Sequence, residues 1–401
     1  MRVLPTFPVL GLFRDTPDEL ADDLSQFIHD VFRGPGRVIP GAEILIRNPN
    51  DGDLGDCCLL TSSPQEFTSG DQPRTRLPRL LRTRLSVMNP AVEVFNPRGQ
   101  SIADIDSVRI FGGYVAHVIN GLRDRVTSSG VGQYDAATAA VLQTWMNAAV
   151  NHFDDPNTPA PLKNYVQGWA DRDPGFGRTW PRSVSLLEFL NGLRHFFPIL
   201  HDDPEGQLYY EVFTRQFQAC QRLSSYGGDL LHDPASENAQ QRAAHDLIEL
   251  LLGPIASGAV GVSEELIESF PRNRLAILSI HQAKGLEFPM VIVDIGSDFR
   301  MDHARQRRDR HPEDGETSHR LETQMRRFSQ GLGAPARAER DRAFDDLIRK
   351  FFVAFSRPEQ CLLLVGLTRC EPRLGNIPNV AAGWDRRGVR RWPATVPITQ
   401  F

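Results

Sequence analysis

Residues Leu275–Ile295 read Leu-Ala-Ile-Leu-Ser-Ile-His-Gln-Ala-Lys-Gly-Leu-Glu-Phe-Pro-Met-Val-Ile-Val-Asp-Ile, two apolar runs around a polar segment. The runs Leu275–Ile280 and Met290–Ile295 each have the length of one buried strand and are rich in β-branched residues. The segment His281–Pro289 contributes a His, an amide, a Lys, a Gly and a Glu. An open α/β sheet usually places its ligand site in such loops at strand ends. The stretch therefore predicts an α/β sheet with a functional loop.

A second patterned stretch, Asp341–Val365, lies downstream. We expect a helix over Asp341–Phe355 and a buried strand over Cys361–Val365. Arg357 falls between the two, so a rigid element can hold its guanidinium at a site. The apolar side chains expected to face inward from this helix are Phe344, Leu347, Ile348, Phe351 and Phe352.

The remaining pattern predicts one lobe interrupted by an insertion. Residues 121–270 show helical periodicity broken by Pro and Gly clusters. We therefore expect an α/β lobe formed by residues 1–120 and 271–401 around a mostly α-helical insertion. Its parallel sheet is expected to contain Ile44–Ile46 and Val92–Phe95 besides the three strands named above.

Local signals add detail to the first part of the chain. Thr16-Pro17-Asp18-Glu19 predicts a helix start, with Thr16 as the cap and Glu19 completing a capping box. Residues 49–75 are polar and turn-rich, which predicts a variable loop. Arg76–Leu85 interleaves Arg with Leu, the pattern of a helix with a basic side.

Composition limits the classes of protein to consider. With 45 Lys and Arg against 50 Asp and Glu, the net charge is −5. This balance does not indicate a protein that coats nucleic acid, although a local positive groove is compatible with it. No apolar run is long enough for a transmembrane helix, and the N-terminus lacks the features of a signal peptide. Five cysteines without a CxxC pair fit a reducing compartment, so we expect a cytoplasmic protein, and the histidines lack zinc spacing, so we expect no metal site.

Both patterned stretches resemble motifs of one protein family. Ser279–Pro289, Ser-Ile-His-Gln-Ala-Lys-Gly-Leu-Glu-Phe-Pro, closely resembles motif V of the UvrD/Rep/PcrA family of superfamily 1 DNA helicases. Asp346–Val365 resembles motif VI, whose usual core is Tyr-Val-Ala-x-Thr-Arg-Ala. The Arg is kept as Arg357, and the departures are Phe352, Ser356 and Pro358.

The resemblance implies a RecA-like lobe of the P-loop NTPase type, the second motor lobe of an ATP-dependent 3′ to 5′ DNA helicase or translocase. Such a motor hydrolyses ATP between two lobes, and this lobe supplies an arginine that stabilises charge on the transferring phosphoryl group. Arg357 is the implied catalytic arginine. Gly285 and Glu287, together with Arg357, are the implied nucleotide-binding residues.

The resemblance also implies contacts with DNA. Ser279, His281, Gln282 and Lys284 would contact phosphate or sugar. Arg47 and Asn48 follow the Ile44–Ile46 strand and resemble the family's Leu-x-Arg-x-Asn loop, which touches single-stranded DNA. The alternative for this pair is a strand end covered by a surface arginine.

Half of the expected motor is missing from the sequence. It contains no Gly-x4-Gly-Lys-Ser/Thr phosphate-binding loop and no apolar strand ending in Asp-Glu. ATP and Mg²⁺ would therefore be shared with a separate protein or missing segment that carries the Walker A and B motifs, and the other partner would be single-stranded or partly duplex DNA. Three alternatives stay open: one half of a split helicase, a truncated product, and a catalytically inactive DNA-binding or scaffold module. DNA repair, replication restart and defence are all compatible with these alternatives.

Two further segments have ambiguous patterns. Residues 298–340 are dense in charge, which predicts a solvated linker, with a DNA-contacting arm at the basic Arg305–Arg310 as the alternative. The tail Asn379–Trp392 mixes Trp with Arg. Such a tail can stack on nucleic acid or cover the lobe.

Overall fold

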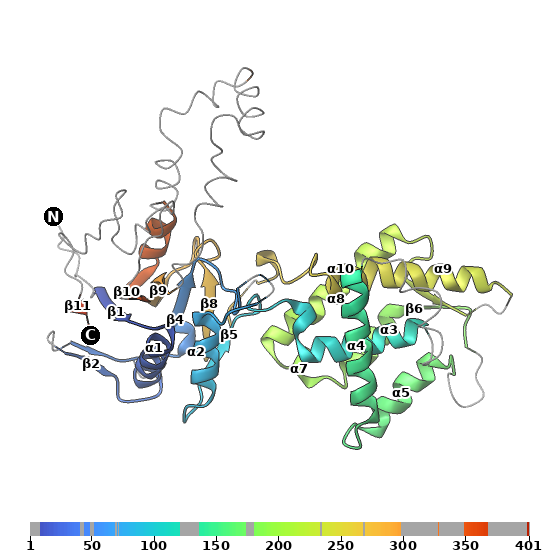
Figure 1. Cartoon of the computed structure of the whole chain (residues 1–401), viewed down its shortest axis with the longest axis horizontal. Coiled ribbons are helices and arrows are strands. Elements are labelled where there is room, and N and C mark those ends of the chain that lie inside the picture. The colour runs from blue at the N-terminus through green and yellow to red at the C-terminus, as the bar shows by residue number, and fades with distance from the viewer. Residues whose placement is uncertain are drawn as a thin grey trace. The chain divides into compact units, whose positions relative to one another are not determined.

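The computed structural model describes residues 9–40, 44–48, 52–68, 70, 72–120, 136–173, 180–232, 235–267, 269–297, 328, 349–367 and 399–400. The chain divides into two compact units (Figure 1). Met1–Gly99 and Phe270–Phe401 form the sheet unit, and Gln100–Ser269 form the helical unit. The expected tail lies outside the described residues, as does the expected linker apart from Phe328.

The sheet unit is built on seven strands in the order β11-β1-β10-β9-β4-β8-β5. Every pairing between neighbours in this sheet is parallel. The α/β class and the parallel sheet are thus confirmed. The strands are β1 (Val9–Arg14), β4 (Cys57–Thr61), β5 (Glu93–Phe95), β8 (Arg274–Ser279), β9 (Phe288–Gly296), β10 (Pro358–Leu367) and β11 (Thr399–Gln400).

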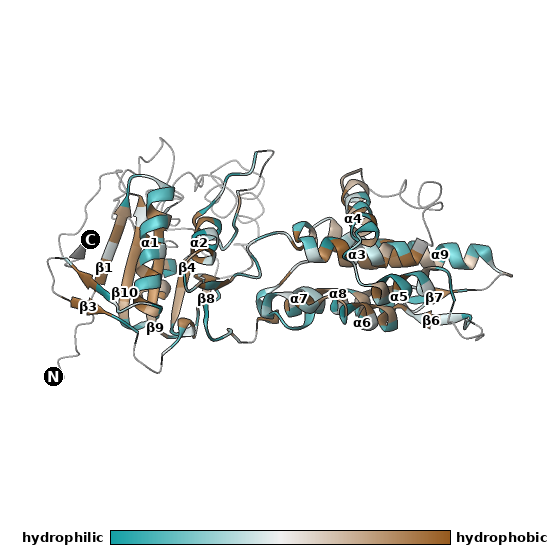
Figure 2. Ribbon diagram, turned by 90° about the horizontal axis from the view of Figure 1, so that it is seen from below, coloured by the Kyte–Doolittle hydropathy of each residue, from teal (hydrophilic) through white to brown (hydrophobic). Residues whose placement is uncertain are grey.

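Both faces of the sheet are covered, which explains the continuous apolar runs in its inner strands. Helices α1 (Pro17–Phe32) and α2 (Leu77–Ser86) pack on one face, against side chains such as Leu59 and Ile292. The apolar sides of these helices face the strands and their polar sides face outward (Figure 2). On the other face, alternate residues of the same strands pack against helical residues 349–355 and the segment between β8 and β9.

The start of α1 follows the local signal in the sequence. The Thr16 side chain accepts a hydrogen bond from the Glu19 backbone N–H, and the Glu19 carboxylate accepts one from the Thr16 N–H, both at 3.2 Å. This capping box satisfies two N–H groups that the first helical turn leaves without partners. The predicted capping box is confirmed.

One strand prediction and one loop prediction in the first part of the chain were wrong. Ile44–Ile46 forms β3, which pairs antiparallel with β2 (Arg37–Ile39) in a separate two-stranded sheet. The place between β8 and β9 belongs to β4, which lies inside the expected loop 49–75. The physical difference is burial: every residue of β4 is buried, whereas Leu45 in the middle of β3 is 49% exposed.

The helix before Arg357 buries fewer side chains than expected. Phe351 is 3% exposed and lies in the core, but Phe352 is 71% exposed, so its predicted inward position was wrong. Successive helical residues point about 100° apart. Here Phe351 lies on the side that faces the sheet, and Phe352 lies on the side that faces solvent. Phe344, Leu347 and Ile348 lie outside the described residues.

The helical unit has its own core, centred on Trp145. The Trp145 indole N–H donates to the carbonyl of Ala103 at 2.9 Å, and a Cβ added to Gly113 would lie 2.1 Å from the Trp145 carbonyl oxygen. Its α-helices are α3 (Asp106–Asn120), α4 (Ala136–Asp154), α5 (Ala160–Ala170), α6 (Leu186–Arg194), α7 (Pro198–His201), α8 (Pro204–Leu223), α9 (Glu237–Leu247) and α10 (Gly253–Ala256), and strands β6 (Ser183–Ser185) and β7 (Asp229–Leu231) form a small antiparallel pair.

The boundary between the units differs from the expected one. The helical unit begins at Gln100 and not at residue 121, because α3 packs closely against α4 and shares its core. Among the helices of the described residues, none is both long enough and apolar enough to cross a membrane.

Ile292→Ala should destabilise the sheet unit by about 2–5 kcal/mol, because Ile292 is fully buried in β9 and its removal leaves a cavity. The matched change Phe352→Ala removes a larger but exposed side chain and should alter stability by about 0.5 kcal/mol or less. Hydrogen exchange of the β9 and β10 amides measures both. Equal effects of the two substitutions would contradict the assigned faces.

Candidate functional site

The connection between β8 and β9 crosses the sheet without a long helix. Both strands flank β4 and run parallel to it, with Ser279 level with Thr61 at one end and Met290 level with Cys57 at the other. Four residues of strand rise by about 13 Å, at roughly 3.3 Å per residue. Residues 280–287, the crossing segment, return the chain across this distance. One segment therefore reaches from the edge of the sheet where the parallel strands end to the edge where they begin.

The crossing segment begins at the edge where the parallel strands end, in a turn built by two polar side chains. The Ser279 N–H donates to the Gln282 side-chain oxygen at 2.8 Å, and the Gln282 N–H donates to the Ser279 hydroxyl at 3.2 Å. The Ile280 N–H donates to the Thr61 carbonyl at 3.1 Å, which fixes the turn to β4. Ser279 and Gln282 thus hold the turn, whereas the side chains of His281 and Lys284 are exposed.

The middle of the segment is fixed by apolar contacts with the sheet. Ile280 and Ala283 are buried against strand residues, and Leu286 packs beside them. Each of these apolar residues is followed by an exposed polar one, so the segment presents His281, Lys284 and Glu287 to solvent.

Arg357 fixes the other end of the segment. Its guanidinium donates to the carbonyls of Leu286 and Val353, each at 3.1 Å, and to the Ser356 hydroxyl at 2.9 Å. The Phe288 N–H donates to the Arg357 carbonyl at 3.1 Å. Leu286 and Arg357 are 71 positions apart in sequence. Their bond joins the crossing segment to the chain before β10, at the edge where β9 and β10 begin.

This junction brings Gly285, Glu287 and Arg357 together on adjoining backbone. Gly285 has a φ of +87°, a conformation that other residues rarely adopt, and a Cβ added there would meet no atom within 4 Å. Glu287 is exposed. Arg357 is half-buried, and its three bonds use three of the five N–H donors of a guanidinium. The geometry can offer an anionic ligand a fixed positive charge.

Arg47 and Asn48 lie elsewhere. They follow β3 of the separate two-stranded sheet, and the Asn48 N–H donates to the carbonyl of Val31 at the end of α1. Helix α1 covers the face of the sheet opposite to the crossing segment. The pair follows a strand as expected, but that strand lies outside the parallel sheet, and the contact of Arg47 and Asn48 with DNA stays a prediction.

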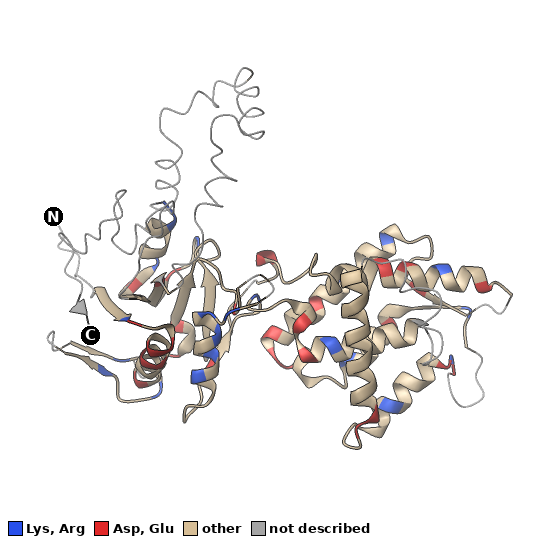
Figure 3. Cartoon of the chain, viewed as in Figure 1, with Lys and Arg blue, Asp and Glu red and all other residues tan. Residues whose placement is uncertain are grey.

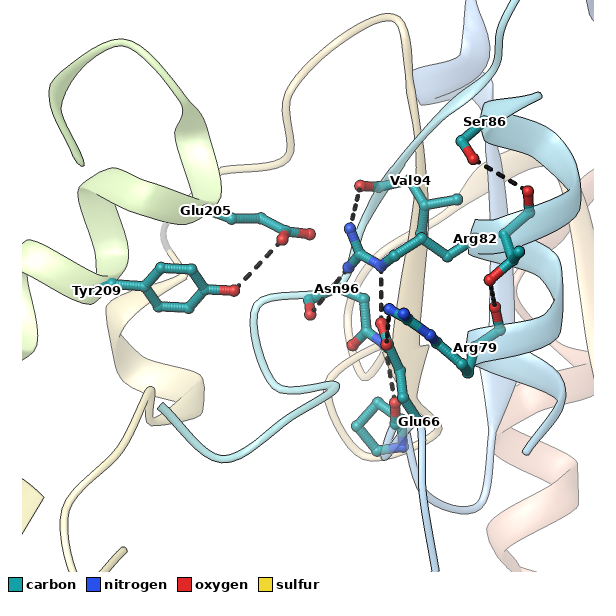
Figure 4. Close-up of polar contacts among 10 residues, drawn as sticks. Glu66, Arg79, Arg82, Ser86, Val94, Asn96, Glu205 and Tyr209 are labelled. Carbon is teal, nitrogen blue, oxygen red and sulfur yellow. Dashed lines mark hydrogen bonds and ion pairs between the residues drawn. The ribbon is translucent and has the colours of Figure 1, made fainter. Parts of the chain in front are cut away.

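The loop after β4 holds a buried ion-pair network that the sequence analysis missed (Figure 4). Glu66 is fully buried and accepts from Arg82 at 2.7 Å and Arg79 at 3.3 Å. Arg82 also donates to the carbonyls of Val94 and Asn96 at 3.4 Å. The network ties the loop after β4 to the outer strand β5. In the sequence, the network corresponds only to one acidic residue, Glu66, followed by two arginines of α2 that are three positions apart, Arg79 and Arg82.

Other arginines of α2 are also paired. Arg84 donates to Asp18 at 2.7 Å and Asp22 at 2.9 Å on α1. The hydrogen bond to Asp22 is the main reason that the pKa of Arg84 is raised. The predicted basic side of α2, visible in Figure 3, is thus partly neutralised by neighbouring carboxylates.

Comparison with known protein families and with curated proteins found no match to this chain. Within the described parts of the chain, no three or more His, Cys, Asp or Glu side chains gather where they could hold a metal ion. The residues that the structure joins are Gly285, Glu287 and Arg357 at one end of the crossing segment and Ser279, His281 and Gln282 at the other, with Lys284 between them.

Arg357→Ala should loosen the crossing segment, because it removes the side-chain bond to the Leu286 carbonyl. Hydrogen bonds to charged groups contribute about 1.5–3 kcal/mol, so amide exchange over residues 281–287 should rise roughly tenfold or more. Mass-resolved hydrogen exchange checks this. The Phe288 amide, bonded to the residue 357 carbonyl, serves as the internal control. Unchanged exchange over the segment would show that Arg357 does not hold it.

Proposed function

We propose that this chain is the second-lobe half of an ATP-dependent DNA helicase or translocase of the UvrD type, with a RecA-like sheet unit and 3′ to 5′ movement. One observation carries the proposal: the Arg357 guanidinium is bonded to the Leu286 carbonyl, between Gly285 and Glu287. The stretches that resemble motifs V and VI thus form one edge, as a nucleotide site between two lobes requires.

In this proposal the edge at Arg357 faces ATP held by a first-lobe partner. The partner supplies the phosphate-binding loop and the Mg²⁺ ligands, and Arg357 supplies charge to the transferring phosphoryl group. Two guanidinium N–H groups that make no bond to described residues suit two phosphoryl oxygens. Gly285 leaves room for the nucleotide, and Glu287 contacts the ribose of the nucleotide.

The part of the crossing segment from its first turn to Lys284 faces DNA. His281 and Lys284 are exposed and contact the phosphate and sugar groups of the strand. Ser279 and Gln282 hold the turn that presents them, so their role is to position the contacts. Because one short segment joins both edges, a shift at the nucleotide end moves the DNA end.

A second candidate function is a catalytically inactive DNA-binding or scaffold module. The observation that favours it is that all three bonds of the Arg357 guanidinium lie within its own unit. Those bonds alone give the residue a structural role, without a nucleotide. The two candidates agree on DNA binding and differ on ATP hydrolysis.

Lys284→Ala should weaken binding of single-stranded DNA and reduce its salt dependence. Loss of one phosphate contact lowers the slope of log K against log salt by about 0.7 for a single strand. Fluorescence anisotropy of a labelled oligonucleotide across a salt series measures the slope. Arg33→Ala is the matched control, since it removes one exposed charge at the end of α1 on the other face. Equal slopes for both variants would exclude Lys284 as a phosphate contact.

DNA-stimulated ATP hydrolysis should be absent from the chain alone and appear on mixing with a protein that carries the first lobe, such as one encoded by an adjacent gene. Arg357→Ala should then lower kcat by about three orders of magnitude while DNA binding persists. Arg357→Lys, which keeps the charge but not the planar fork, should recover only part of the loss. Hydrolysis by the chain alone would overturn the split motor, and DNA binding without hydrolysis in the mixture would favour the inactive module.

A further inference from the structure

A cluster of arginines lies around the loop after β4 and was not part of the expected site. Residues 66–68 and 72–76 form the two arms of a turn, with Phe67 bridged to Thr75 and the Arg76 N–H bonded to the Glu66 carbonyl at 2.9 Å. A single buried carboxylate, that of Glu66, lies at its base. The arginines on or beside this turn are Arg74, Arg76, Arg79, Arg82 and Arg98.

Topology places this turn at the edge where the crossing segment begins. β8 lies between β4 and β5 in the sheet. The Glu66 N–H bonds to the Gly99 carbonyl, beyond the end of β5, at 2.6 Å. The loop that leaves β4 must therefore pass the end of β8, where Ser279 starts the crossing segment. The arginine-rich turn and the proposed DNA contacts share one edge.

At the turn, an aromatic ring makes a cation–π contact with an arginine and stays partly open to solvent. The Arg79 guanidinium lies 5.7 Å from the centroid of the Phe67 ring, and the ion pair with Glu66 holds it there. Phe67 nevertheless keeps 37% of its surface exposed. A large apolar ring with one side covered by a cation offers its other side to a flat partner. Beside it, Arg74 is exposed, and its backbone is held by two bonds to Thr68.

We propose that Phe67, in cation–π contact with Arg79, is a platform for one base of single-stranded DNA and that Arg74 contacts an adjacent phosphate. The inference rests on the proposed DNA binding and adds a contact that the family resemblance does not supply. Nucleic acid fits better than a folded acidic partner, because a partly exposed ring next to several arginines matches alternating bases and phosphates. The buried Glu66 keeps the platform rigid by fixing both Arg79 and Arg82.

The test compares two strands of roughly 16 nucleotides, within the range of single-strand binding sites, one of thymidine and one of abasic sites. Phe67→Ala should weaken binding of the thymidine strand about tenfold, in line with the usual contribution of one stacked base, and leave the abasic strand unchanged. Phe67→Trp should restore binding. Arg74→Ala should lower the salt slope by about 0.7 on both strands. Val87→Ala, which changes an 80% exposed apolar residue at the other end of α2, should alter neither.

The outcomes separate this inference from the proposed function. If Phe67→Ala weakens both strands equally or neither, the platform is overturned, while a loss on Lys284→Ala still supports the DNA edge. If the unchanged protein binds neither strand, both the platform and the proposed function fall. A selective loss on the thymidine strand, recovered by Phe67→Trp, supports the platform.

Discussion

The parallel direction of β8 and β9 is the constraint on which the rest of the site depends. Two parallel strands on either side of β4 cannot be joined by a turn, so the chain must return across a face of the sheet. Most crossovers of this kind use a helix, whereas this one uses eight residues, 280–287, packed down by Ile280 and Ala283. The short crossing sets Ser279 at one edge and Glu287 at the other. Polar residues that form one short motif in the sequence thereby lie at opposite ends of the strands.

The charged side chains are also arranged locally. A protein with a net charge of −5 has no general attraction for nucleic acid, and its arginines act locally. Arg84 is paired with the carboxylates of α1, Arg82 and Arg79 meet at the buried Glu66, and Arg74 stays exposed at the turn above them. The buried carboxylate of Glu66 accepts from two arginines and fixes the geometry of the groups around it.

The parts of this fold that follow from the sequence are those whose signal is local. β8, β9 and β10 have continuous apolar runs, and the capping box at Thr16 needs only four residues, so both were predictable. β4 was missed because its apolar core is the four residues Cys57–Leu60 in a polar, turn-rich stretch, and its burial depends on neighbours distant in sequence. β3 was misplaced for the same reason, since nothing local distinguishes it from a strand of the parallel sheet. The Glu66 network required knowing that β4 and β5 flank β8.

Arg357 shows how one side chain can serve structure and chemistry together. Bonds to Leu286, Val353 and Ser356 orient the guanidinium before any ligand arrives, which removes the entropy that a free arginine would lose on binding. Its planar fork still has donors in fixed directions. In the proposed split motor, an arginine held in this way needs no rearrangement when the partner completes the site. The same bonds connect the crossing segment to β10, so the positions of Leu286 and Arg357 depend on each other.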